Sequence, residues 1–71
     1  MKLTLKAARV SKNLTQKEAA KLIGVTEDTI RSYEQGKTYP DIPRLKKIEE
    51  IYGIGYNQII FLPENYALSV K

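Results

Sequence analysis

The chain has 71 residues, so we expect one small domain with one hydrophobic core and no second catalytic or ligand-sensing domain. It contains no cysteine and no histidine, which excludes disulfides and thiolate metal sites and removes the commonest general base and zinc ligand. Twelve basic and eight acidic residues give a formal net charge of +4, which suits a polyanionic partner such as nucleic acid.

The same composition argues against enzymes and membrane proteins. No nucleophile and base can be paired without histidine or cysteine, and the sequence has no glycine-rich phosphate loop. No apolar run approaches the ~20 residues that span a membrane, and early charges interrupt any signal peptide. We therefore expect a cytoplasmic protein that is not an enzyme, with no cofactor, no metal and no membrane partner.

Glycine and proline divide the sequence into short segments with helical periodicity, and we predict an all-α fold of five short helices. The first helix is predicted over about residues 4–12, with Asn13 as its C-terminal stop. The residues spaced to share its inward face are Leu5, Ala8 and Arg9.

A second helix is predicted over residues 16–23. Thr15 followed three residues later by Glu18 is a capping-box pattern, which predicts a helix start at Gln16. Gly24 follows the last helical residue and can adopt the left-handed conformation that ends a helix. A tight turn should therefore separate this helix from the next.

The third helix should begin after Thr26, which is a good N-cap, and end before Gly36. Ile30 and Tyr33 are three residues apart and should face the core. Two carboxylates in the first turn complement the positive end of the helix dipole.

A fourth helix should start at Asp41, tolerate Pro43 in its first turn and end at Gly53. Its apolar stripe consists of Leu45, Ile48, Ile51 and Tyr52. A fifth short helix is predicted over about residues 56–61. The tail alternates apolar residues and is either frayed or an edge strand; these residues are Tyr66, Leu68 and Val70.

The segment from Leu14 to Lys37 resembles the Cro/CI-type, XRE-like helix-turn-helix family of phage and bacterial repressors. The residues that bear the resemblance are Gln16, Ala20, Gly24, Ile30, and the ending Tyr33-Glu34-Gln35-Gly36-Lys37. The resemblance extends over roughly residues 3–62. It implies a lambda-repressor-like DNA-binding domain in residues 1–62. The alternating apolar residues make 63–71 a C-terminal tail for dimerisation or an edge strand, or one that folds back on its own core.

The resemblance also implies roles for particular residues. Gln16 would contact a phosphate, and Thr26, Glu27, Asp28 and Ser32 would lie at or near base edges. By their own chemistry, Arg31 could reach a phosphate or a guanine and Lys37 a phosphate, or both are only solvated. Lys17 and Lys21 either flank the DNA backbone or are only solvated. The predicted DNA-binding set is Gln16, Lys17, Thr26, Glu27, Asp28, Thr29, Arg31, Ser32 and Lys37. The family also pairs an arginine with a glutamate for structural reasons, at the positions of Arg9 and Glu34.

This chain departs from the family pattern at the head of the third helix. Glu27 and Asp28 stand where relatives often have Gln, Arg or Ser, and phosphates would repel them. They either accept hydrogen bonds from cytosine amino groups or only stabilise the helix N-terminus.

Two functions follow as hypotheses. The first is a sequence-specific transcription regulator, a repressor of phage or prophage type, that binds a double-stranded DNA operator as a homodimer with half-sites ~34 Å apart. The second is an antirepressor-type module that uses the acids to capture another phage repressor and binds DNA only weakly or within that complex.

Overall fold

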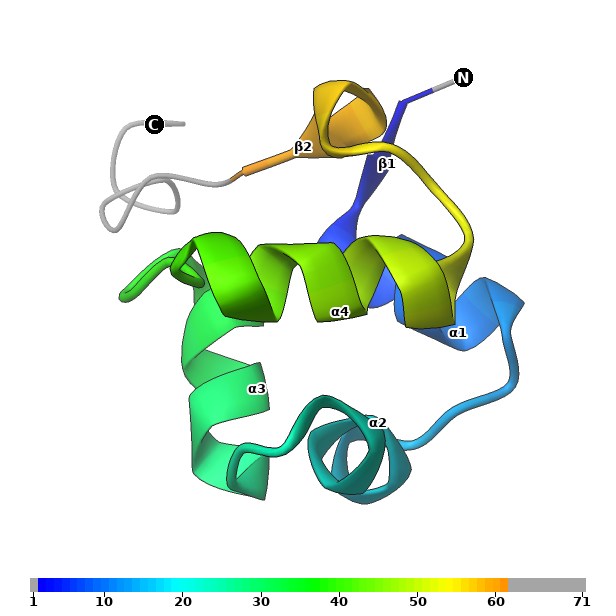
Figure 1. Ribbon diagram of the computed structural model, residues 1–71. Coiled ribbons are helices and arrows are strands. Elements are labelled where there is room, and N and C mark those ends of the chain that lie inside the picture. Colours follow the sequence, from blue (N-terminus) through cyan, green and yellow to red (C-terminus); the bar gives the residue numbers. More distant parts are fainter. Residues whose placement is uncertain (1, 62–71) are drawn as a thin grey trace, which may run out of the picture.

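Four α-helices and one short pair of strands make up residues 2–61, the part of the chain that the computed structural model describes (Figure 1). The helices are α1 (Leu5–Ser11), α2 (Gln16–Ile23), α3 (Glu27–Gln35) and α4 (Ile42–Tyr52). A single 3₁₀ turn, η1, covers Tyr56–Gln58, and the strands are β1 (Leu3–Thr4) and β2 (Ile59–Ile60).

Each α-helix is preceded by an N-cap residue whose side chain accepts a hydrogen bond from the backbone N–H three residues later. These N-caps are Thr4, Thr15, Thr26 and Asp41. At Thr15 the capping box is complete, because Glu18 also accepts from the Thr15 backbone N–H at 2.9 Å. The cap satisfies backbone donors that the first helical turn would otherwise leave without partners, so the predicted start of α2 is confirmed.

Helix ends depend on residues that tolerate a positive φ. Asn13 follows α1 with φ 59°, and Gly24 follows α2 with φ 91°. A Cβ added at Gly24 would meet no atom within 4 Å, so glycine is favoured there by its backbone conformation and not by lack of space. Both helix ends lie where the sequence predicts them.

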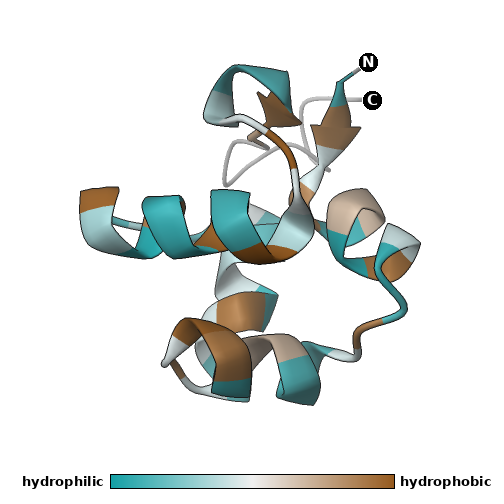
Figure 2. Cartoon of the chain, turned by 45° about the vertical axis from the view of Figure 1, so that its right-hand side comes forward, coloured by the Kyte–Doolittle hydropathy of each residue, from teal (hydrophilic) through white to brown (hydrophobic). Residues whose placement is uncertain are grey.

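The core is where α1, α2, α3 and α4 meet. Ile30 of α3 and Ile48 of α4 are its largest fully buried side chains, and Ala8 and Ala19 are completely buried beside them. Figure 2 shows each helix divided between apolar and polar residues, and the apolar residues that are buried include Leu5, Ile23, Ile30 and Ile48. The predicted inward faces of the first, third and fourth helices are therefore confirmed, although Leu45 and Ile51 are only partly buried.

The predicted fifth helix over residues 56–61 is wrong, and the prediction of five helices fails with it. After the single turn η1 the chain becomes extended, and β2 pairs in parallel with β1, with Leu3 opposite Ile59 and Thr4 opposite Ile60. Two consecutive β-branched isoleucines favour an extended backbone, and the N-terminal segment supplies hydrogen-bonding partners. The fold of the described residues is mostly helical with one short strand pair.

Two further predictions bear on membranes and on the tail. No helix within residues 2–61 has the length and apolar character needed to cross a membrane. Residues 63–71, predicted to form a dimerisation segment or an edge strand, lie outside the described residues, as do Tyr66, Leu68 and Val70.

Candidate nucleic-acid interface

Helices α2 and α3 are packed against each other across a tight turn (Figure 1). The backbone N–H groups of Gly24 and Val25 both donate to the Ala20 carbonyl, at 2.8 and 3.0 Å. Ala20 is 4% exposed and belongs to the buried core. A small side chain there permits the close approach of the two helices, so this geometry is that of a helix-turn-helix unit.

A buried ion pair fixes the end of α3 to α1. Arg9 Nε lies 2.6 Å from Glu34 Oε2, and Arg9 Nη2 donates to Glu34 Oε1 at 3.2 Å. The side chains are 9% and 5% exposed, and the hydrogen bond with Glu34 raises the pKa of Arg9. Arg9 Nη1 also donates to the Leu14 carbonyl at 2.7 Å, so one guanidinium joins α1, the following loop and α3.

Gln16, the first residue of α2, joins the same cluster. Its Nε2 donates to Glu34 Oε1 at 3.0 Å, and the residue is only half-buried. Sequence reasoning assigned Gln16 to a phosphate and missed this bond, because the two residues are far apart in the chain. The Glu34 carboxylate therefore orients the side chains of both Arg9 and Gln16.

Three charged side chains form an exposed cluster at the head of α3, which we call the Arg31 clamp: Glu27, Asp28 and Arg31. Arg31 Nη1 lies 2.5 Å from Asp28 Oδ1, and Arg31 Nη2 lies 3.6 Å from Glu27 Oε2. Asp28 is 88% exposed, whereas Arg31 and Glu27 are about half-exposed. Separate roles were predicted for these residues; their spacing of three and four positions on a helix was the signal for the pairing.

Thr26 and Thr29 bind each other at the start of α3. Thr26 Oγ1 accepts from the Thr29 backbone N–H at 3.2 Å and lies 2.9 Å from Thr29 Oγ1. Both hydroxyls thus have local partners, and Thr26 serves as the N-cap. Their position at the head of α3 agrees with the predicted site, but their hydrogen bonds are structural.

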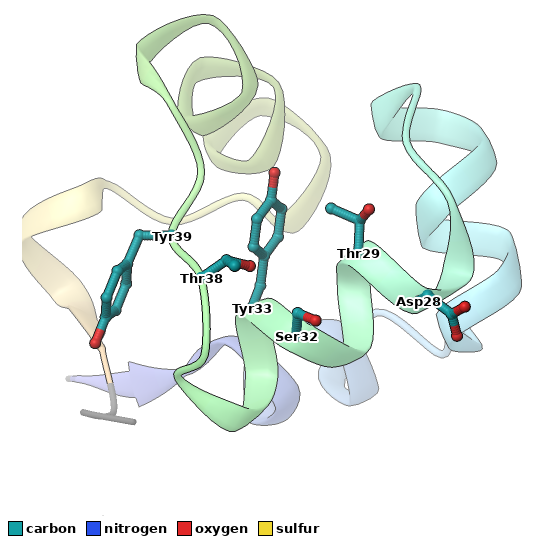
Figure 3. A pocket seen from close by; sticks show the side chains of 6 residues that line it. All are labelled: Asp28, Thr29, Ser32, Tyr33, Thr38 and Tyr39. Carbon is teal, nitrogen blue, oxygen red and sulfur yellow. The ribbon is translucent and has the colours of Figure 1, made fainter. Parts of the chain in front are cut away.

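A shallow hollow lies between α3 and the loop that follows it. Figure 3 shows its lining, in which five of six side chains have a hydroxyl group: Asp28, Thr29, Ser32, Tyr33, Thr38 and Tyr39. The backbone N–H groups of Lys37 and Thr38 donate to the Ser32 carbonyl, which keeps the loop close to α3. Sequence reasoning did not include Thr38 or Tyr39 in the site.

Two lysines of the predicted DNA-binding set, Lys17 and Lys37, are exposed. Lys17 is exposed in the first turn of α2, and Lys37 is exposed just after α3. Neither forms an ion pair with any residue in the range 2–61. Both ammonium groups are therefore available to an anionic partner. Over the same range, no cluster of three or more acidic side chains is arranged to bind a metal ion.

Comparison with known proteins identifies this arrangement. A protein-family model described as helix-turn-helix matches residues 5–59, which include all four α-helices and η1. The chain belongs to this helix-turn-helix family. The match covers most of the chain, so it is not an isolated local similarity of the α2–turn–α3 unit.

The relatives of this helix-turn-helix protein are transcription regulators. The chain is 35% identical over 60 residues to the regulator PuuR of Escherichia coli, covering 84% of this chain and 32% of that protein. It is 35% identical over 65 residues to an uncharacterised HTH-type regulator of Methanocaldococcus jannaschii, covering 92% and 98%. It is 33% identical over 52 residues to the repressor RstR of the cryptic phage CTXphi in Vibrio cholerae, covering 73% and 47%. The chain thus spans about a third of PuuR and about half of RstR.

Proposed function

We propose that this protein regulates transcription by binding double-stranded DNA with α3 in the major groove. The observation that supports this most directly is the α2–turn–α3 unit, in which Ile30 and Tyr33 are buried while the opposite face of α3 is exposed. A helix presented in this way fits the width of the groove, and its outward side chains can contact base edges. The names of the relatives, all of them transcription regulators, support the same function.

In this proposal, contacts to phosphates come from the start of α2 and from the loop after α3, and contacts to bases come from the exposed face of α3. Lys17 and Lys37 would neutralise phosphates on either side of the groove, and Gln16 would donate its remaining amide N–H to a phosphate. Ser32 and the Arg31 clamp, all on α3, would contact bases. The protein would act in the cytoplasm, where its DNA is.

We further propose that the protein is a repressor that binds a symmetric operator as a homodimer. The similarity to the phage repressor RstR supports repression and a phage or prophage origin. A domain of this size offers few phosphate contacts by itself, and two copies on half-sites ~34 Å apart would double them.

The second candidate function is an antirepressor that captures another phage repressor. The observation that favours it is the acidic excess at the head of α3, where two carboxylates accompany one guanidinium. Such a surface would complement a basic patch on another regulator. Neutralising both acids separates the two functions, because Glu27→Gln with Asp28→Asn should impair operator selectivity in a DNA regulator and partner capture in an antirepressor.

The deciding experiment is selection of bound sequences from a random DNA library at two salt concentrations, with sequencing of the bound fraction. A DNA regulator yields a palindromic motif, and Ser32→Ala changes the preferred bases. Lys37→Ala should weaken binding to all sequences and reduce the salt slope by about one per subunit, or about two for the dimer, whereas Lys46→Ala on α4 should leave the slope unchanged. No motif at either salt concentration would reject DNA reading and favour the antirepressor.

A further inference from the structure

We infer that Arg31 recognises the guanine of a G·C base pair in each half-site, and that Glu27 and Asp28 position its guanidinium for that contact. This inference rests on the proposed function and names the base that the site recognises. It also gives the two acids a role besides stabilising the start of α3.

Arg31 keeps N–H donors that its two carboxylate partners do not use. A guanidinium has five N–H groups, and the two carboxylates engage one terminal nitrogen each, Nη1 with Asp28 and Nη2 with Glu27. Only Nη1 donates a hydrogen bond within the clamp, to Asp28, because the 3.6 Å between Nη2 and Glu27 Oε2 is an ion-pair distance and too long for a hydrogen bond. Four N–H groups are therefore left over. Two of them suffice for a bidentate contact, so the clamp leaves Arg31 able to bind a base while restraining its orientation.

Restraint of the Arg31 side chain before binding favours affinity for DNA. An arginine side chain has many rotamers, and binding loses affinity when they must be fixed at that moment. Carboxylates three and four positions N-terminal to Arg31 restrain the side chain along the exposed face of α3 before DNA arrives. The free protein therefore already has its guanidinium on the surface that would enter the groove.

The negative charge of Asp28 favours a base over a phosphate as the partner of Arg31. Asp28 is 88% exposed and in contact with Arg31, so placing this guanidinium on a phosphate would bring a carboxylate close to the anionic backbone. A guanine edge presents two uncharged acceptors, O6 and N7, at the spacing of two arginine N–H groups. Its paired cytosine presents an N4 amino donor beside them, which suits the free oxygen of Asp28.

The test uses the selected operator with one chemical change. Each guanine of the half-site is replaced in turn, symmetrically, by 7-deazaguanine, which lacks the N7 acceptor. We expect one of these replacements to weaken binding of the wild-type protein about tenfold. The same replacement should not weaken binding of Arg31→Ala, because that variant has lost the contact, and Arg31→Lys should keep general DNA affinity but lose the discrimination.

Positioning is tested separately with Asp28→Asn. If Asp28 only repels DNA, this variant binds all sequences more tightly with the same preference. If Asp28 positions Arg31, the variant binds random DNA more tightly and yet discriminates less between the operator and its G-to-A substitute. Glu50→Gln is the matched control, since it removes one exposed acidic charge on α4 and should leave the discrimination unchanged.

The outcomes distinguish this inference from the proposed function. A palindromic motif with no sensitive guanine, or a guanine to which Arg31→Ala is as sensitive as the wild type, overturns the recognition by Arg31 and leaves DNA binding intact. Unchanged discrimination in Asp28→Asn overturns the positioning role. If no motif is selected at all, both the inference and the proposed DNA-binding function fail.

Discussion

Gln16 at the start of α2 donates a hydrogen bond from Nε2 to Oε1 of Glu34 near the end of α3, at 3.0 Å. The same Glu34 oxygen accepts from Arg9 of α1, so one carboxylate connects three helices. Because the geometry between α2 and α3 determines how α3 would meet the groove, this cluster links the stability of the fold to the shape of the proposed interface.

Glu34→Gln should be strongly destabilising. It leaves the Arg9 guanidinium buried without its counter-charge, and loss of one partner from a buried pair costs about 3–5 kcal/mol of unfolding free energy. Urea denaturation of Glu34→Gln and of the double variant Arg9→Met with Glu34→Leu tests this. The double variant should regain most of the loss because it leaves no isolated charge. A single variant within about 0.5 kcal/mol of the wild type would contradict the structural role.

Ala20→Leu should destabilise the contact between α2 and α3. The residue is buried where the helices meet, and added methylene groups in a packed core cost about 1–3 kcal/mol. Leu22→Ala on the same helix is the control, since Leu22 is 52% exposed and its truncation should change stability by less than about 0.5 kcal/mol. Equal losses of stability in the two variants would contradict close packing of α2 against α3 at Ala20.

The capping box predicts a pH-dependent contribution from Glu18. Hydrogen bonds from the Thr15 backbone and side chain lower the pKa of Glu18. A lowered folded-state pKa stabilises the protein above the ordinary glutamate pKa, and the benefit disappears as pH falls through the folded-state value. The stability difference between wild type and Glu18→Gln in urea should therefore be present at neutral pH and shrink in acid. A difference that stays constant down to low pH would reject the bond.

Tyr52 should titrate later than an ordinary tyrosine. Burial raises the pKa of its phenol to about 12, with a further contribution from the nearby charge of Glu34. Because the folded-state pKa is raised, its contribution to stability is complete below the unfolded value of about 10 and is lost as pH rises toward 12. Phenolate absorbance during alkaline titration should show a late component that is smaller in Tyr52→Phe, where Tyr33, whose pKa is also raised by burial, remains to titrate late. A late component of the same size in the variant would contradict the assignment.

Much of the fold could be predicted because its signals are local. Caps at Thr15, Thr26 and Asp41 and the stop at Gly24 depend on residues within a few positions of each other, so helix starts and ends followed directly. The family resemblance was also local in origin, since the motif from Leu14 to Lys37 is continuous in the sequence. Comparison with the family model confirmed it over residues 5–59.

What the sequence could not predict depends on contacts between distant segments. The strand pair requires residues 3–4 to meet residues 59–60, and short apolar runs such as Ile59-Ile60 fit either a helix or a strand. The bond from Gln16 to Glu34 likewise appears only once three helices are packed. The Arg31 clamp is different. Its spacing of three and four residues on one helix was visible in the sequence, although the pairing was not predicted.

The pairing of β1 with β2 brings the two ends of the described region side by side, at the opposite end of the molecule from the head of α3 (Figure 1). Polypeptide attached before β1 would therefore start far from the head of α3. Phe61, just after β2, lies nearer the candidate site, because its ring packs edge-on against that of Tyr39 with 6.0 Å between the centroids, and Tyr39 lines the hollow beside α3. For the experimenter, a fluorescent label or affinity tag placed before residue 3 should disturb DNA binding less than one placed after residue 61.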